Sequence, residues 1–137
     1  MKDPIEYVET LARGLDADDY EMVASVLSDQ VEYSIGSEVI HGPAAVLTSY
    51  REASEMAHGL FDMVVYDHEV KATDNHDIFR VSYSDELTVA GETLKHLAEQ
   101  HVTVVPGDGV VRIVNVDLPG EREKVNEFMA RHGLSRD

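Results

Sequence analysis

The feature that most constrains the fold is a run of four β-rich stretches, joined by short breaks, in the second half of the chain. The stretches cover residues 61–72, 77–89, 93–105 and 110–118, and the breaks contain Gly, Pro, Asn and Asp. Such breaks are typical of hairpin turns, in which consecutive strands pair antiparallel. This order excludes parallel crossovers and predicts a sheet of long strands, which must twist and curl strongly.

Helices are predicted before this sheet and after it. Asp3, Pro4 and Glu6 form a capping pattern for a first helix, which we expect to end at Gly14. Three further helices are expected near residues 19–27, 43–59 and 121–132. We therefore predict one α+β domain, residues 1–137, with a cone-shaped, curved antiparallel sheet that is mixed at its edge. The N-terminal helices should pack on its concave face, and a short C-terminal helix should follow the sheet.

The composition narrows the range of partners. Asp and Glu outnumber Lys and Arg by 27 to 11, which leaves a net charge of −16, and a nucleic-acid surface would need clustered basic residues. The acidic excess indicates either a cationic partner or a solvated acidic coat, and the coat is the simpler interpretation. The absence of Cys excludes disulfides and zinc-thiolate sites. With no membrane-spanning run and no signal-peptide pattern, we expect a cytoplasmic protein that binds no membrane.

Four local strings carry a likeness to a known family. They are LARG at 11–14, LSDQVEY at 27–33, HGPAAV at 41–46 and GVVRI at 109–113. Together with the order of elements they resemble the SnoaL-like and nuclear transport factor 2-like superfamily over nearly the whole chain. The resemblance implies a conical pocket between sheet and helices. It leaves the activity open, since the superfamily includes ketosteroid isomerases, epoxide hydrolases, polyketide cyclases, dehydratases, transport factors and members with no known activity.

One local likeness is to ketosteroid isomerase, without its catalytic carboxylates. Tyr7 stands at a position similar to that of the isomerase's oxyanion tyrosine. Tyr33 stands where the base aspartate belongs, and His101, counted back from Gly109, stands where the second, protonated aspartate belongs. Because both acids are replaced, we reject steroid isomerisation and keep only the pocket geometry.

Strand alternation converts this likeness into a predicted pocket, because side chains two residues apart share a face. The predicted ligand contacts are Phe79, Val81, Tyr83, Leu97, Val114 and Val116. The same alternation also turns Asp62, Val64, Tyr66, His68, Asp85, Glu99, His101 and Leu118 inward. A β-bulge would reverse the faces and offer Asp67, Glu69, His96, Asn115 and Asp117 instead.

Two classes of function follow from this pocket. The first is a cofactor-free lyase or isomerase that acts on a small, largely apolar oxygenated molecule. In it, His101 is the acid/base, Glu99 orients it, and Tyr7 and Tyr33 hold the substrate oxygen. The second is a non-enzymatic ligand-binding or dimerisation module, in which His101 and Tyr7 are merely structural.

Other kinds of site receive little support. A metal site is not expected, because the chain contains neither His-x-His nor His-Glu-x-x-His, and Gly-x-Ser-x-Gly is absent too. A homodimer through the sheet face is expected. Its apolar outer surface would be formed by Ile78, Val102, Val104, Val111 and Ile113.

Overall fold

The computed structural model describes residues 3–134, which contain four helices and six strands. In chain order these are α1 (Pro4–Asp16), α2 (Tyr20–Ala24), β1 (Leu27–Ile35), β2 (Glu38–His41), α3 (Pro43–Leu60), β3 (Met63–Ala72), β4 (Ile78–Val89), β5 (Glu92–Val105), β6 (Gly109–Val116) and α4 (Glu121–Arg131). The four consecutive strands of the second half follow the predicted stretches closely.

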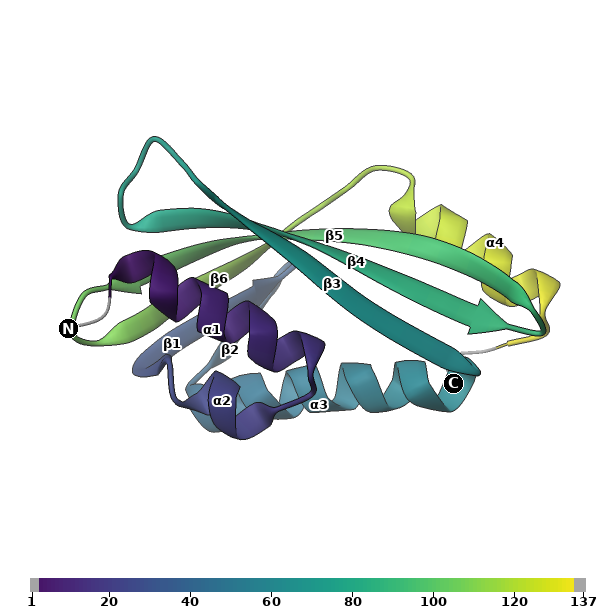
Figure 1. Ribbon diagram of the computed structural model, residues 1–137, viewed down its shortest axis with the longest axis horizontal. Helices are drawn as coiled ribbons and strands as arrows, with labels where there is room; N and C mark the ends of the chain where they lie inside the picture. The colour runs from purple at the N-terminus through teal and green to yellow at the C-terminus, as the bar shows by residue number, and fades with distance from the viewer. Residues whose placement is uncertain (1–2, 135–137) are drawn as a thin grey trace.

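The strands form one sheet in the order β2-β1-β6-β5-β4-β3. All neighbouring pairs are antiparallel except β1 and β6, which run parallel. The predicted curved α+β sheet with a mixed edge is confirmed, and β1 and β6 supply its parallel pair. No hairpin joins β1 to β6, so their direction is set by packing and not by a turn. Figure 1 shows the long β3, β4 and β5 twisting across the helices α1, α2 and α3.

Helix α1 begins as predicted but ends later. The backbone amide of Asp3 donates a hydrogen bond to Glu6 Oε2 at 3.1 Å, which caps the first turn. The helix then continues past Gly14 to Asp16, so the predicted stop is wrong. Gly14 is buried against α2, where an added Cβ would lie 2.7 Å from Val23 Cγ2. The glycine therefore allows two helices to approach closely and does not end the first one.

The main core lies between the helices and the concave face of the sheet. Val102, Val104 and Ile113 belong to it, and each is 0% exposed. The prediction that these three residues form an apolar outer surface is wrong. Alternation shows that one face of a strand is buried, but it does not say which face. The homodimer through the sheet face stays a prediction.

A second, smaller core lies where α3 ends. There α4 packs Phe128 and Met129 against Phe61 and Leu87. Figure 1 shows α4 beside the far ends of β4 and β5, at the opposite end of the sheet from the start of α1. The concave face between the two cores holds the candidate site. None of the helices in the described part of the chain is both long and apolar enough to cross a lipid bilayer.

Candidate functional site

A pocket of about 200 Å³ lies between the N-terminal helices and the concave face of β3, β4 and β5. The helices and the α1–α2 loop contribute Leu15, Asp16, Asp18, Tyr20, Tyr50, Ala53, Ser54 and Ala57, and the strands contribute Tyr66, Tyr83, Asp85, Ala98 and Gln100. The lining thus combines apolar walls with a few carboxyl and hydroxyl groups. Such a composition is typical of sites for small organic ligands.

Asp85 is the pocket residue best suited to proton transfer. It lies on β4 and pairs with Tyr66 of β3 on one side and His96 of β5 on the other. Burial raises the pKa of Asp85 to about 6, and the negative charge of Asp16 adds to the rise. The Asp85 side chain has no hydrogen-bond or ion-pair partner among the described residues. A carboxyl group with this pKa can both accept and return a proton near neutral pH.

Two tyrosine hydroxyls accompany Asp85. The hydroxyl of Tyr83 is buried and has no hydrogen-bond partner within residues 3–134, and burial raises its pKa. The hydroxyl of Tyr66 lies 3.0 Å from Ser54 Oγ, and burial raises the pKa of this tyrosine as well. Both side chains therefore stay protonated at neutral pH. Because Ser54 donates its proton to Asp18, Tyr66 donates to Ser54, whereas the Tyr83 hydroxyl can donate a hydrogen bond to a ligand oxygen.

Asp18 organises the mouth of the pocket. Its Oδ1 accepts hydrogen bonds from Ser54 Oγ at 2.7 Å and from the Tyr20 hydroxyl at 3.2 Å. Its Oδ2 lies 3.1 Å from His58 Nε2. The backbone of Asp18 has φ of 52°, a left-handed conformation that is uncommon outside glycine. Through these contacts the loop between α1 and α2 is held against α3.

Behind the pocket wall, His68 links β3 to α1. Its Nδ1 lies 2.5 Å from Asp16 Oδ2, and its Nε2 lies 3.4 Å from Glu9 Oε2. Burial by itself lowers the pKa of His68, but the hydrogen bond and charge of Asp16, together with those of Glu9, outweigh it and raise the pKa. The second oxygen of Asp16, Oδ1, is buried without a hydrogen-bond partner in the described chain.

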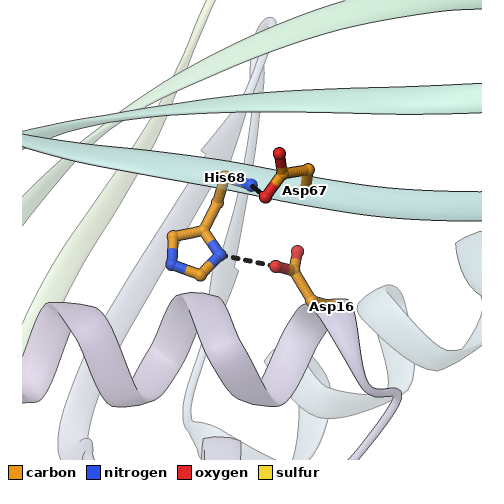
Figure 2. Close-up of side chains that lie close together, drawn as sticks. All are labelled: Asp16, Asp67 and His68. Atoms are coloured by element: carbon orange, nitrogen blue, oxygen red, sulfur yellow. Dashed lines mark hydrogen bonds and ion pairs between the residues drawn. The ribbon is translucent and has the colours of Figure 1, made fainter.

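Asp16, Asp67 and His68 also bring their potential ligand atoms within 4.8 Å of one another. Asp67, however, is exposed, and its Oδ1 accepts a hydrogen bond from the backbone amide of His68 at 2.9 Å. Figure 2 shows the Asp67 carboxylate beside its own strand, whereas Asp16 and His68 face each other. Because these atoms already bond to one another, the group fits a structural ion pair better than a metal centre.

Tyr33 and Tyr50 belong to a network around Gln100, which is 5% exposed. Gln100 Oε1 accepts from the Tyr50 hydroxyl at 3.3 Å, and its Nε2 donates to the Tyr33 hydroxyl at 3.2 Å and to Asn115 Oδ1 at 2.7 Å. The two tyrosine rings stack with centroids 5.0 Å apart. The Tyr33 hydroxyl is therefore engaged inside the fold and, contrary to the prediction, lies outside the pocket lining.

The predicted acid/base pair lies on the outer face of the sheet. His101 and Glu99 flank the buried Gln100 on β5, and the side chain of His101 is 48% exposed. Leu97 shares this face and is 43% exposed. The prediction that these three residues face the pocket is wrong, although His101 Nε2 does lie 3.6 Å from Glu99 Oε2.

The buried residues of β5 explain this error. Gln100, Val102 and Val104 face the interior, so the alternate residues Glu99 and His101 point outward. The register does shift between Thr103 and Val104, but the extra residue is on β6, where Val110 and Arg112 pair with Val104 and Thr103. Val114 and Val116 pair with the two misplaced acid/base residues and lie on the outer face with them. Their predicted place in the pocket is therefore wrong as well.

On β3 and β4 the structure agrees with the predicted faces. Tyr66, Tyr83 and Asp85 line the pocket. Phe79 and Val81 share the concave face but are buried in the main core, and they do not belong to the lining. Tyr7 of α1 packs, partly buried, against the same core and is likewise outside the lining.

The sequence matches no protein-family profile and no curated protein. Solved structures match over most of the chain. SalBIII, described as an epoxide hydrolase/cyclase-like enzyme in pyran ring formation in the polyether salinomycin, has a TM-score of 0.67 and 14% identity, covering 86% of this chain and 92% of its own. An LEH-like epoxide hydrolase from M. tuberculosis has a TM-score of 0.66 and 15% identity, covering 96% and 95%. An NTF2-like protein of unknown function from Exiguobacterium has a TM-score of 0.64 and 12% identity, covering 82% and 98%.

The chain has the SnoaL-like, nuclear transport factor 2-like fold. At 12–15% identity these likenesses establish the fold alone, so the function must be argued from the site.

Within this nuclear transport factor 2-like fold, sequence reasoning missed the helix side of the pocket. Asp16 and Asp18 follow the predicted end of the first helix, and the sequence pattern indicates for them only a capping role at the start of the second helix. Tyr50 and Ser54 lie one helical turn apart on α3, a spacing that places them on one face. This spacing is a sequence signal that could have identified the two residues as neighbours, but it does not show that their helix face borders a cavity.

Proposed function

We propose that the protein binds a small, largely apolar oxygenated molecule in this pocket and that Asp85 transfers a proton within it, without a cofactor. The observation that carries the proposal is the Asp85 carboxyl group, which has a pKa of about 6 and lies with tyrosine hydroxyls in a largely apolar cavity. The corresponding reaction class is that of a lyase or an isomerase. Support comes from the epoxide hydrolase and the cyclase-like enzyme that share the fold.

The residues suggest a division of roles. The Asp85 carboxylate removes a proton from a carbon next to a carbonyl group, and the electron pair of the C–H bond moves onto the carbonyl oxygen. The Tyr83 hydroxyl, which lacks a partner within residues 3–134, donates a hydrogen bond to that oxygen as its negative charge develops. Protonated Asp85 then returns the proton to another carbon in an isomerisation, or to a leaving hydroxyl that departs as water in an elimination.

The alternative is a non-enzymatic ligand-binding protein. The observation that favours it is the lining itself, in which tyrosine and alanine side chains offer contact area to a small ligand whether or not it reacts. Binding and proton transfer can be separated by one experiment, because a probe can occupy the pocket without reacting.

The test uses nitrobenzisoxazole, a small aromatic probe of carboxylate bases. Loss of its C–H proton to the base breaks the N–O bond and releases a coloured nitrophenolate. We expect the rate to rise with pH through about 6 and to fall by about 100-fold in Asp85→Asn, as is typical when a general base is removed. The matched control is Glu86→Gln, which removes an exposed carboxylate from the next residue of β4 and should leave the rate unchanged.

Equal rates in the wild type and in Asp85→Asn would contradict the catalytic role. Binding of the probe, measured by calorimetry, without a rate above that of buffer would identify a binding module. Native mass spectrometry of protein purified from its own host would then be the direct route to the natural ligand.

A further inference from the structure

The three carboxyl groups of the pocket lining differ in whether a histidine is paired with them. Asp16 is paired with His68, and Asp18 is paired with His58. Asp85 is the third carboxyl group of the lining and has no such partner among the described residues. Among residues 3–134, no Lys, Arg or His belongs to the lining. One negative charge therefore remains uncompensated inside the cavity whenever Asp85 is ionised.

Two polar atoms of the pocket that lack hydrogen-bond partners among the described residues indicate which groups a ligand should carry. Asp16 Oδ1 is buried with no hydrogen-bond partner in residues 3–134, and so is the hydroxyl of Tyr83. A carboxylate oxygen can only accept hydrogen bonds, so the group that satisfies Asp16 must be a donor. A neutral ketone or a carboxylate ligand brings acceptors only, whereas an ammonium group brings several donors and a positive charge.

The aromatic lining is compatible with such a ligand. Tyr20, Tyr50, Tyr66 and Tyr83 contribute to the walls, and burial raises the pKa of each, so all four stay neutral at physiological pH. Tyrosine rings attract cations through their electron-rich faces, and this attraction strengthens when the cation is removed from water. One such pair is already present at the mouth, where Arg51 lies 5.2 Å from the centroid of the Tyr20 ring.

We propose that the ligand of this pocket is a small oxygenated amine, whose ammonium group lies beside Asp16 and Asp85 while its oxygen accepts a hydrogen bond from the Tyr83 hydroxyl. Its apolar body lies against the alanine side chains of α3 and β5 that line the same cavity. This inference rests on the proposed function, because it assigns a ligand class to the same pocket. It also gives the excess of acidic residues a role, since a negative field concentrates cations near the protein.

The test compares three probes of similar size, namely benzylamine, benzyl alcohol and phenylacetate. Calorimetry at neutral pH measures their binding to the wild type, to Asp85→Asn and to Glu86→Gln. Benzylamine should bind about tenfold or more tightly than benzyl alcohol, and phenylacetate should bind weakest, as expected for a charge-assisted hydrogen bond. In Asp85→Asn this advantage should largely disappear while the affinity for benzyl alcohol changes by about twofold or less. Glu86→Gln also removes one negative charge and should retain the advantage, because its side chain is exposed and outside the lining.

The outcomes separate this inference from the proposed function. If benzyl alcohol binds as tightly as benzylamine, or if Glu86→Gln removes the advantage as fully as Asp85→Asn, the amine assignment is overturned and the pocket for neutral oxygenated molecules stands. The variant Ala53→Phe, which fills the cavity from the exposed side of α3, should abolish binding of the amine. Undiminished binding to this variant, with the fold intact by circular dichroism, would overturn the pocket as the site and both proposals with it.

Discussion

Replacing Asp85 by Asn should make the protein more stable at alkaline pH. The pKa of Asp85 is raised from its ordinary value of 3.8 to about 6, first by burial and then by the charge of Asp16. Each pH unit of difference corresponds to about 1.4 kcal/mol, so ionised Asp85 lowers the free energy of unfolding by about 3 kcal/mol relative to an unperturbed carboxyl group. The Asn side chain has the same shape but cannot ionise. It should recover about 2 kcal/mol of this amount and not the whole, because burying its amide also costs free energy.

The pH dependence has a definite sign. A raised pKa means that the native state holds its proton where the unfolded chain has lost it, from about pH 4 to about pH 6. The stability of the wild type relative to Asp85→Asn therefore falls as pH rises through this window and stays low above it. Urea denaturation at several pH values measures the difference, and contributions of the other carboxyl groups cancel between the two proteins. An Asp85→Asn variant that is no more stable than the wild type at about pH 8 would refute the buried carboxyl group of raised pKa on which the site depends.

Two further predictions concern the frame around the pocket. His68→Gln should lower stability by about 1 kcal/mol at acidic and neutral pH, with solvent screening allowed for. Because the pKa of His68 is raised, this stabilisation is complete below the ordinary value of 6.5 and is lost as pH rises through the raised value, which urea denaturation across that range would show. Gly109→Ala should destabilise by about 3 kcal/mol or more, since φ is 119° and the new Cβ would lie 2.5 Å from the Val26 carbonyl oxygen. Gly107→Ala is the matched control in thermal unfolding, because φ is also positive there but nothing lies within 4 Å.

The sequence was sufficient to predict the architecture because hairpin turns and helix caps are local signals. The four long strands were separated by turn residues, and Asp3 with Glu6 marked the first helix correctly. Local signals could not identify β1 and β6 as the parallel pair of the predicted mixed edge, since these strands are far apart in the chain. The same holds for Gly14, whose role depends on a second helix packed against it.

The faces of the strands were predictable only where apolar residues marked them clearly. On β4, Phe79 and Val81 are buried, and the alternation from them leads correctly to Tyr83 and Asp85. On β5 the hydrophobic signal is misleading, because Leu97 is exposed whereas a polar glutamine is buried in a network of hydrogen bonds. Such a buried amide is satisfied by partners from other elements, and those partners are invisible in the local sequence.

Small side chains at three positions explain why the concave face is hollow at this place and filled elsewhere. Ala53 and Ala57 of α3 lie opposite Ala98 of β5 across the pocket, whereas the neighbouring main core is filled by residues such as Val81 and Val102. Larger apolar residues at the three alanine positions would bury more surface, and each buried methylene adds about 0.8 kcal/mol to stability. The chain instead leaves a cavity and places a carboxyl group of raised pKa in its wall. The cavity and the buried carboxyl group each lower the stability of the fold, and both occur at one location. Such a combination is expected of a binding or catalytic site.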